Sequence, residues 1–203
     1  RTSGTCHKSK PLGEYGQLAF AGRIEEPLGG KFFAELSQRE FQRGLQAQRA
    51  GRADEAQRIW EALAKTNPEL GGVHANLGVL HRSAGRHPAS VAALEKAVVA
   101  SPKQARFWNE LGVSYRHAGQ FAKAQTAYER ALAEDGNSAA AALNLGILHD
   151  VYLNDAAKAL PLYERALTLS PGDANLSKWA ADVRKRAGAG ATPTPTPPKK
   201  EAS

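Results

Sequence analysis

The chain has 203 residues, no methionine and one cysteine, Cys6. A lone cysteine excludes an internal disulfide, and with it a small disulfide-stapled fold. No apolar run approaches the roughly 20 residues of a membrane-spanning helix, so we expect no transmembrane segment. Since position 1 is Arg rather than Met, we expect a processed or truncated chain whose preceding residues are hidden.

Concentrated positive charge is also missing, although the net charge is +7. Residues 37–173 hold 16 basic and 14 acidic side chains. A small basic cluster at Arg184-Lys185-Arg186 suits the C-terminal end of a helix. Because no basic stripe could follow a phosphate backbone, we expect no nucleic-acid partner.

The chemistry of an enzyme is not apparent either. No acidic pair, set of metal ligands or nucleophile with a partner base occurs at a meaningful spacing. His81 and His149 stand at equivalent places of a repeat described next, and we interpret them as packed side chains rather than metal ligands. We therefore expect no enzymatic activity, metal or cofactor.

What the chain does contain is a 34-residue period. Trp108, Leu111, Gly112 and Tyr115 spell W-x2-L-G-x2-Y. The glycine recurs every 34 residues at four positions: Gly44, Gly78, Gly112 and Gly146. The preceding leucine and a closing proline recur with it, as Leu77, Leu111 and Leu145, and as Pro68, Pro102 and Pro171.

This pattern resembles the tetratricopeptide repeat (TPR) family over about two thirds of the chain. The resemblance implies an all-α fold, a right-handed superhelical α-solenoid of helix–turn–helix units. In register, the four units are 37–70, 71–104, 105–138 and 139–173.

The residue types fit close helix packing. Small residues at helix crossings let the two helices of a unit approach: the four glycines on the first helix, and Ala56, Ser90, Ala124 and Ala159 on the second. We predict that bulky residues fill the seam between units: Trp60, Leu94, Tyr128 and Tyr163. A further glycine marks the turn inside a unit, where a left-handed backbone suits glycine: Gly51, Gly85 and Gly119.

The fourth unit departs from the period. Its extra residue falls in Val151–Asp155, and Pro161 follows where the period places helix interior. We predict that the second helix of this unit is irregular or kinked between Asp155 and Pro161.

The residues before and after the four units do not follow the 34-residue period. Asp173 can cap a helix over residues 174–187, with Leu176, Trp179 and Val183 on one face, which would cover the apolar end of the solenoid. We expect Trp179 to be a core anchor. Residues 188–203 form a Thr/Pro-rich tail that we expect to be disordered, and residues 1–36 a mostly irregular segment.

The family resemblance also implies a site. First helices of successive TPR units line a concave groove that binds a partner peptide or helix. We count positions from the start of each unit. Residues at the fifth, sixth and ninth positions, with the flanking arginines, form the candidate groove: Phe41, Leu45, Asn76, Val79, Arg82, Arg106, Asn109, Val113, Arg116, Asn144 and Ile147. The competing interpretation is that the apolar members only pack neighbouring helices.

Two functions fit. The first is a non-catalytic scaffold in a bacterial envelope assembly, periplasmic or associated with the outer membrane. Residues 143–149, the stretched turn 151–155 and residues 178–184 resemble bacterial TPR lipoproteins that accompany proton-driven envelope motors, including gliding-motility machinery. Export would fit a lipid anchor on Cys6 or on a cysteine before Arg1, with the latter favoured.

The second is a cytoplasmic TPR co-chaperone or adaptor that recognises C-terminal peptides through a basic clamp. That family pattern has Lys and Asn at the fifth and ninth places of its first repeat, where this chain has Phe41 and Leu45. It has a basic residue at the sixth place of the third, where Glu110 stands. Only Asn76 and Arg106 fit, so the pattern disfavours this function.

Overall fold

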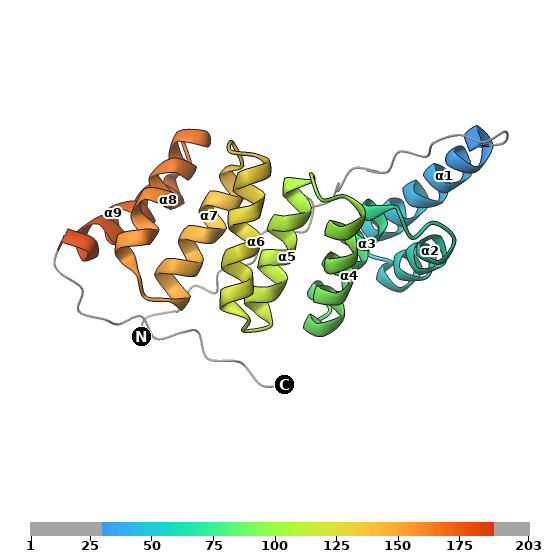
Figure 1. Ribbon diagram of the computed structural model, residues 1–203, viewed down its shortest axis with the longest axis horizontal. Helices are drawn as coiled ribbons and strands as arrows, with labels where there is room; N and C mark the ends of the chain where they lie inside the picture. Colours follow the sequence, from blue (N-terminus) through green and yellow to red (C-terminus); the bar gives the residue numbers. More distant parts are fainter. Residues whose placement is uncertain (1–29, 189–203) are drawn as a thin grey trace.

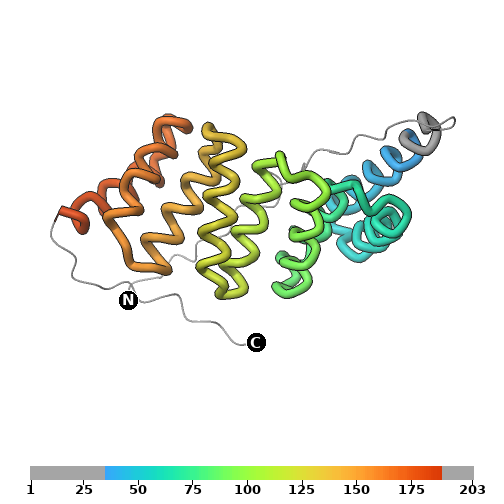
Figure 2. The backbone as a smooth tube through the Cα atoms, in the orientation of Figure 1, coloured from blue at the N-terminus to red at the C-terminus, as the bar shows by residue number. Residues whose placement is uncertain are grey.

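The computed structural model describes residues 30–188, and all regular structure in that range is helical. Successive helices pair and stack side by side into an elongated array (Figures 1 and 2). The elements are α1 (Gly30–Arg49), α2 (Ala53–Thr66), α3 (Gly71–Ser83), α4 (His87–Ala100), α5 (Ala105–His117), α6 (Phe121–Glu134), α7 (Ala139–Ile147), the π-helical turn η2 (Leu148–Tyr152), α8 (Ala156–Leu169) and α9 (Ala174–Gly188). The predicted all-α solenoid is confirmed, and no helix within 30–188 is long and apolar enough to cross a membrane.

The first helix begins earlier than the sequence suggested. We expected residues 1–36 to be mostly irregular, but α1 already begins at Gly30. No proline lies between Gly30 and the first unit, so the helix can extend back to Gly30. The rest of the expected N-terminal segment, and the tail from 189 on, lie outside the described residues.

Each unit is held together by a close approach of its two helices. A methyl group added to Gly112 would lie 2.5 Å from the ring of Tyr128, and one on Gly78 would lie 2.5 Å from Leu94. Gly44 meets Trp60 in the same way, and Gly146 meets Tyr163. Each of these large residues covers the glycine of its own unit, and Leu94 and Tyr128 also belong to a core cluster with residues of the second, third and fourth units.

The turns inside the first three units use the predicted glycines. Their φ angles are 74° at Gly51, 70° at Gly85 and 73° at Gly119, all in the left-handed region. The fourth unit has no glycine there, and Asn154 adopts φ 53° instead. Asparagine tolerates this conformation better than most side chains.

The extra residue of the fourth unit is absorbed before its second helix, not within it. α7 ends in η2, where the amide of Leu153 donates to the carbonyl of Leu148 at 3.0 Å, one residue further than in an α-helix. α8 then runs from Ala156 through Pro161 to Leu169. We predicted that the second helix is irregular or kinked between Asp155 and Pro161; the irregular backbone lies instead in the turn before α8, which takes up the insertion. A bend of α8 at Pro161 stays a prediction.

Asn154 gives a direct test of this turn. Asn154→Val should lower the free energy of unfolding by about 1–2 kcal/mol, because a β-branched residue is strained at positive φ. Asn154→Gly, which relieves the strain, should leave stability equal or higher. Urea unfolding of both variants checks this; equal midpoints for the two would show that the backbone at Asn154 is unconstrained.

The last helix caps the array. The Asp173 carboxylate accepts the amide of Leu176 at 3.0 Å, as predicted for an N-cap, and Leu176 and Val183 are buried against α8 and its neighbours. The expectation for Trp179 was wrong: 49 % of it is exposed, and Ala180 takes the buried place. The buried stripe of α9 is 176–180–183, which leaves Trp179 on the adjacent face.

Candidate functional site

A groove of about 580 Å³ crosses α3, α5 and α7, the first helices of the second, third and fourth units. Seven of the eleven predicted groove residues line it: Val79, Arg82, Arg106, Asn109, Val113, Arg116 and Asn144. Leu143 lines it as well. The groove therefore spans three units and leaves out the first.

Phe41 and Leu45 do not belong to this groove. They are 1 % and 4 % exposed and lie in the core between α1 and α2. The ring of Phe41 lies 6.3 Å from that of Trp60. For these two residues the competing interpretation, helix packing, is correct.

Asn76 and Ile147 are the other two predicted residues outside the groove. Asn76 is buried, and its amide donates to the carbonyl of Gly72 in its own helix at 2.7 Å. Ile147 lies on a smaller cavity of about 200 Å³ beside Trp179. It occupies the ninth place of the last unit, where α9 replaces a further repeat.

The groove contains a buried ion pair, which we did not predict from the sequence. Arg82 contacts the Glu110 carboxylate at 2.5 Å and donates to the Ser114 hydroxyl at 3.0 Å. The two charged side chains are 15 % and 8 % exposed. We predicted Arg82 as a cation for a partner; its charge is instead matched by Glu110.

The helix register carried a signal for this pair. Arg82 stands at the twelfth place of one unit and Glu110 at the sixth place of the next. An acid and a base at those two places therefore mark a pair across first helices.

Two asparagines form a polar bridge across the groove. The side-chain amide of Asn144 on α7 donates to the side-chain oxygen of Asn109 on α5 at 3.0 Å. An asparagine side chain has two donor hydrogens and an acceptor oxygen, so this one bond uses only part of their capacity. The pair can thus offer both a donor and an acceptor to a peptide backbone.

Apolar and cationic side chains surround this bridge. Val113 and Leu143 are half-buried and contribute apolar surface. Arg116 lies with its guanidinium 5.4 Å from the centre of the Tyr152 ring, which fixes its side chain by a cation–π contact. Arg106 and Asp135 line the groove as well.

His149 is packed in the core, as interpreted from the sequence, and it predicts a pH effect. His149 is 5 % exposed, and burial lowers the pKa of its ring, an effect that Asp155 partly opposes. Within residues 30–188, no three acidic, histidine or cysteine side chains are placed to hold a metal ion.

We expect the protein to lose stability as the pH falls below about 6.5, the ordinary histidine value. The unfolded chain then binds a proton that His149 in the folded state resists, so unfolding is favoured as pH decreases. An NMR titration, with His149→Gln to assign the signal, should place the pKa of His149 below 6.5. A value at or above 6.5 would contradict the burial argument.

The comparisons with known proteins agree with this architecture. The family model described as tetratricopeptide repeat matches residues 41–105, and a second with the same description matches residues 103–171. Together they cover more than half of the chain. No curated protein sequence matches it.

Solved structures with a similar fold include three of particular interest. A crystal structure of MamA has a TM-score of 0.66 and 23 % identity, covering 71 % of this chain and 84 % of its own. Pseudomonas aeruginosa PilF has a TM-score of 0.69 and 18 % identity; the match covers 77 % of this chain and 71 % of PilF. The first TPR domain of Spaghetti (RPAP3), bound to the HSP90 peptide SRMEEVD, has a TM-score of 0.55 and 19 % identity, covering 58 % and 93 %. At these identities the likeness concerns the fold alone.

Proposed function

The chain belongs to the tetratricopeptide repeat family, whose members are generally non-catalytic scaffolds that bind other proteins, and we propose that it binds a partner segment in the groove of α3, α5 and α7. The observation that carries this proposal is the polar bridge of Asn109 and Asn144 between the half-buried side chains of Val113 and Leu143.

The bridge favours an extended peptide. In a helix the backbone amides and carbonyls are already paired with one another, whereas an extended chain exposes both to a partner. Asn109 and Asn144 would hold such a backbone, and apolar side chains of the partner would contact Val113 and Leu143. This division of roles is the one seen where main-chain bonds give affinity and pockets give specificity.

Charge adds an acidic preference. Glu110 matches the charge of Arg82, so the positive character that we propose for the groove comes mainly from Arg116. A partner segment with acidic residues among apolar anchors fits, and its charge would mainly accelerate encounter. The peptide named in the RPAP3 structure, SRMEEVD, is also acidic.

A peptide library displayed on phage tests the proposal. Selected peptides should bind the wild-type protein and lose at least about tenfold in affinity to Val113→Asp, because the substitution places a charge among the apolar contacts. Arg106→Ala should mainly slow association at low salt.

The matched control is Ala133→Asp, the same charge on an exposed position of α6. It should leave affinity unchanged, and circular dichroism should show equal helical content in all variants. Equal affinity of wild type and Val113→Asp would eliminate the groove as the binding surface.

The co-chaperone alternative receives little support. Phe41 and Leu45, which stand where a carboxylate clamp has Lys and Asn, are buried in the first unit. Glu110, in place of a basic residue, is bound to Arg82. A clamp for a terminal carboxylate would need cations at these places.

We further propose that the scaffold acts in a bacterial envelope assembly, periplasmic or associated with the outer membrane, and held by a lipid on Cys6 or an upstream cysteine. Its support is the resemblance of residues 143–149, 151–155 and 178–184 to envelope TPR lipoproteins. Expression of the complete gene, cell fractionation and labelling with an alkyne fatty acid test this. Unlabelled protein in the cytoplasmic fraction would contradict it.

A further inference from the structure

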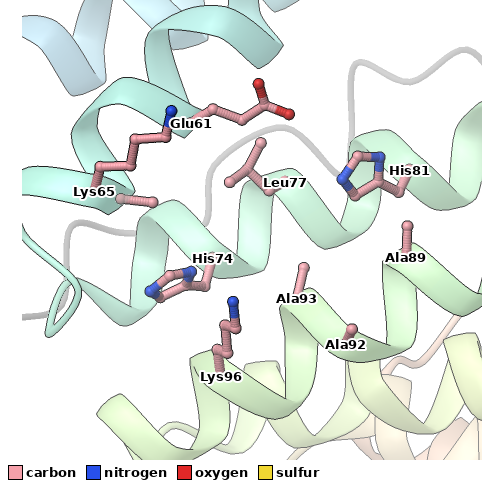
Figure 3. A pocket seen from close by; sticks show the side chains of 10 residues that line it. Glu61, Lys65, His74, Leu77, His81, Ala89, Ala92, Ala93 and Lys96 are labelled. Carbon is pink, nitrogen blue, oxygen red and sulfur yellow. The ribbon is translucent and has the colours of Figure 1, made fainter.

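A second cleft, of about 370 Å³, opens between α2, α3 and α4 (Figure 3). It lies on a different face of α3 from the groove: His74, Leu77 and His81 line the cleft, whereas Val79 and Arg82 line the groove. We call it the inter-repeat cleft. Its size can be understood by comparing it with the same place one unit further along the chain.

One repeat later, a tyrosine fills that space. The hydroxyl of Tyr115 on α5 donates to the carboxylate of Glu95 on α4 at 2.7 Å. The ammonium group of Lys123 on α6 lies 5.4 Å from the centre of the same ring. Ring, acid and cation together close the seam between those helices.

At the inter-repeat cleft only the acid of this trio is kept. A shift of 34 residues turns Glu95 into Glu61, Tyr115 into His81 and Lys123 into Ala89. The smaller imidazole carries a buried Nδ1 without a hydrogen-bond partner. A phenol ring and a lysine side chain are therefore replaced by an open space beside a carboxylate.

The other end of the cleft repeats the comparison. The Nε1 of Trp108 donates to the carbonyl of Pro102 at 2.7 Å. His74, one repeat earlier, keeps that contact, with Nε2 2.9 Å from the carbonyl of Pro68. A histidine thus preserves the backbone contact of the tryptophan but fills less of the seam.

We propose that the inter-repeat cleft is a second interaction surface, which takes the side chain of a tyrosine from a partner protein. The ring would contact Leu77 and the alanines of α4, and its hydroxyl would donate to Glu61, as the hydroxyl of Tyr115 does to Glu95. The partner supplies the aromatic group that this seam lacks.

Charge around the cleft defines the partner further. Lys65 and Lys96 flank it on α2 and α4 (Figure 3), and within residues 30–188 Glu61 is the only acidic residue that lines it. Val99, on the same face of α4 as Lys96, is 81 % exposed. A tyrosine among acidic residues, with an apolar neighbour for Val99, complements this surface.

p-Cresol, the side-chain analogue of tyrosine, is the first probe. In ¹⁵N NMR spectra it should shift the amide signals of Leu77, His81 and Ala93, and toluene should bind several-fold more weakly because it lacks the hydroxyl. His81→Tyr, which copies Tyr115, should fill the cleft from within and abolish these shifts.

Two controls separate filling from misfolding. Ala89→Lys copies Lys123 at a partly exposed position and should also weaken p-cresol binding, while Val113→Asp in the groove should not. Melting curves should show every variant folded. Shifts that persist in His81→Tyr, or that wild type never shows, would overturn the proposal.

The acidic preference needs a peptide probe. Acetyl-Asp-Glu-Tyr-Glu-Asp-amide should bind more tightly than acetyl-Ser-Gly-Tyr-Gly-Ser-amide, and Lys96→Glu should weaken only the former, by about two- to fivefold. Equal binding of both peptides would reject the acidic partner. The two proposals can fail separately. Peptide binding in the groove without binding in the inter-repeat cleft would reject only the cleft, and binding in the cleft alone would reject only the groove.

Discussion

Replacing Tyr128 by alanine is expected to lower the free energy of unfolding by about 3–5 kcal/mol. Tyr128 is fully buried, and its ring covers Gly112 in the central core cluster. Gly112 has no side chain to move into the space, so α5 and α6 would enclose a cavity. Because neighbouring units stabilise each other, the loss should affect the array beyond this unit.

Tyr128→Phe is the matched control. It keeps the ring over Gly112 and removes only the buried hydroxyl. Its effect should stay below about 1 kcal/mol. Urea unfolding followed by circular dichroism measures both; similar losses for the two variants would show that the ring packing is not what stabilises the unit.

The second large effect is expected at the ion pair of the groove. Arg82→Met should lower the free energy of unfolding by about 3–5 kcal/mol, because it leaves the carboxylate of Glu110, 8 % exposed, without its charge partner. The double variant Arg82→Met/Glu110→Leu should recover most of the loss, since replacing both partners removes the unpaired charge.

A double-mutant cycle measures this coupling. It also tests the role assigned to Arg82. Because its guanidinium is paired with Glu110, Arg82 should contribute more to stability than to peptide binding. If Arg82→Met leaves stability unchanged and weakens peptide binding instead, Arg82 is a ligand contact, as its sequence position suggested.

Sequence reasoning recovered what the period dictates. The 34-residue spacing predicts the helix pairs, the glycines under large side chains and the left-handed turns at Gly51, Gly85 and Gly119. These features are local: each follows from a small residue where two backbones approach or where φ is positive. The groove lining was recovered in three of the four units.

The features that we did not predict depend on contacts between units, or on positions where the sequence fits more than one local backbone arrangement. An inserted residue can be accommodated in a helix or in a turn, and only the structure shows η2 taking it up. The spacings 176–179–183 and 176–180–183 both fit one face of a helix. Periodicity therefore does not decide whether Trp179 or Ala180 is buried in α9. Phe41 and Leu45 were assigned to a surface because the first unit was treated like those after it.

The central claim is that the groove of α3, α5 and α7 holds the partner. A photo-cross-linking residue can be placed at Leu143 in the groove, at Ala92 in the inter-repeat cleft and at the exposed Ala133, in cells that express the complete protein. The account predicts one discrete cross-linked partner from Leu143 that is lost with Val113→Asp, and none from Ala133. A partner cross-linked equally from Ala133, or one retained at Leu143 despite Val113→Asp, would contradict it.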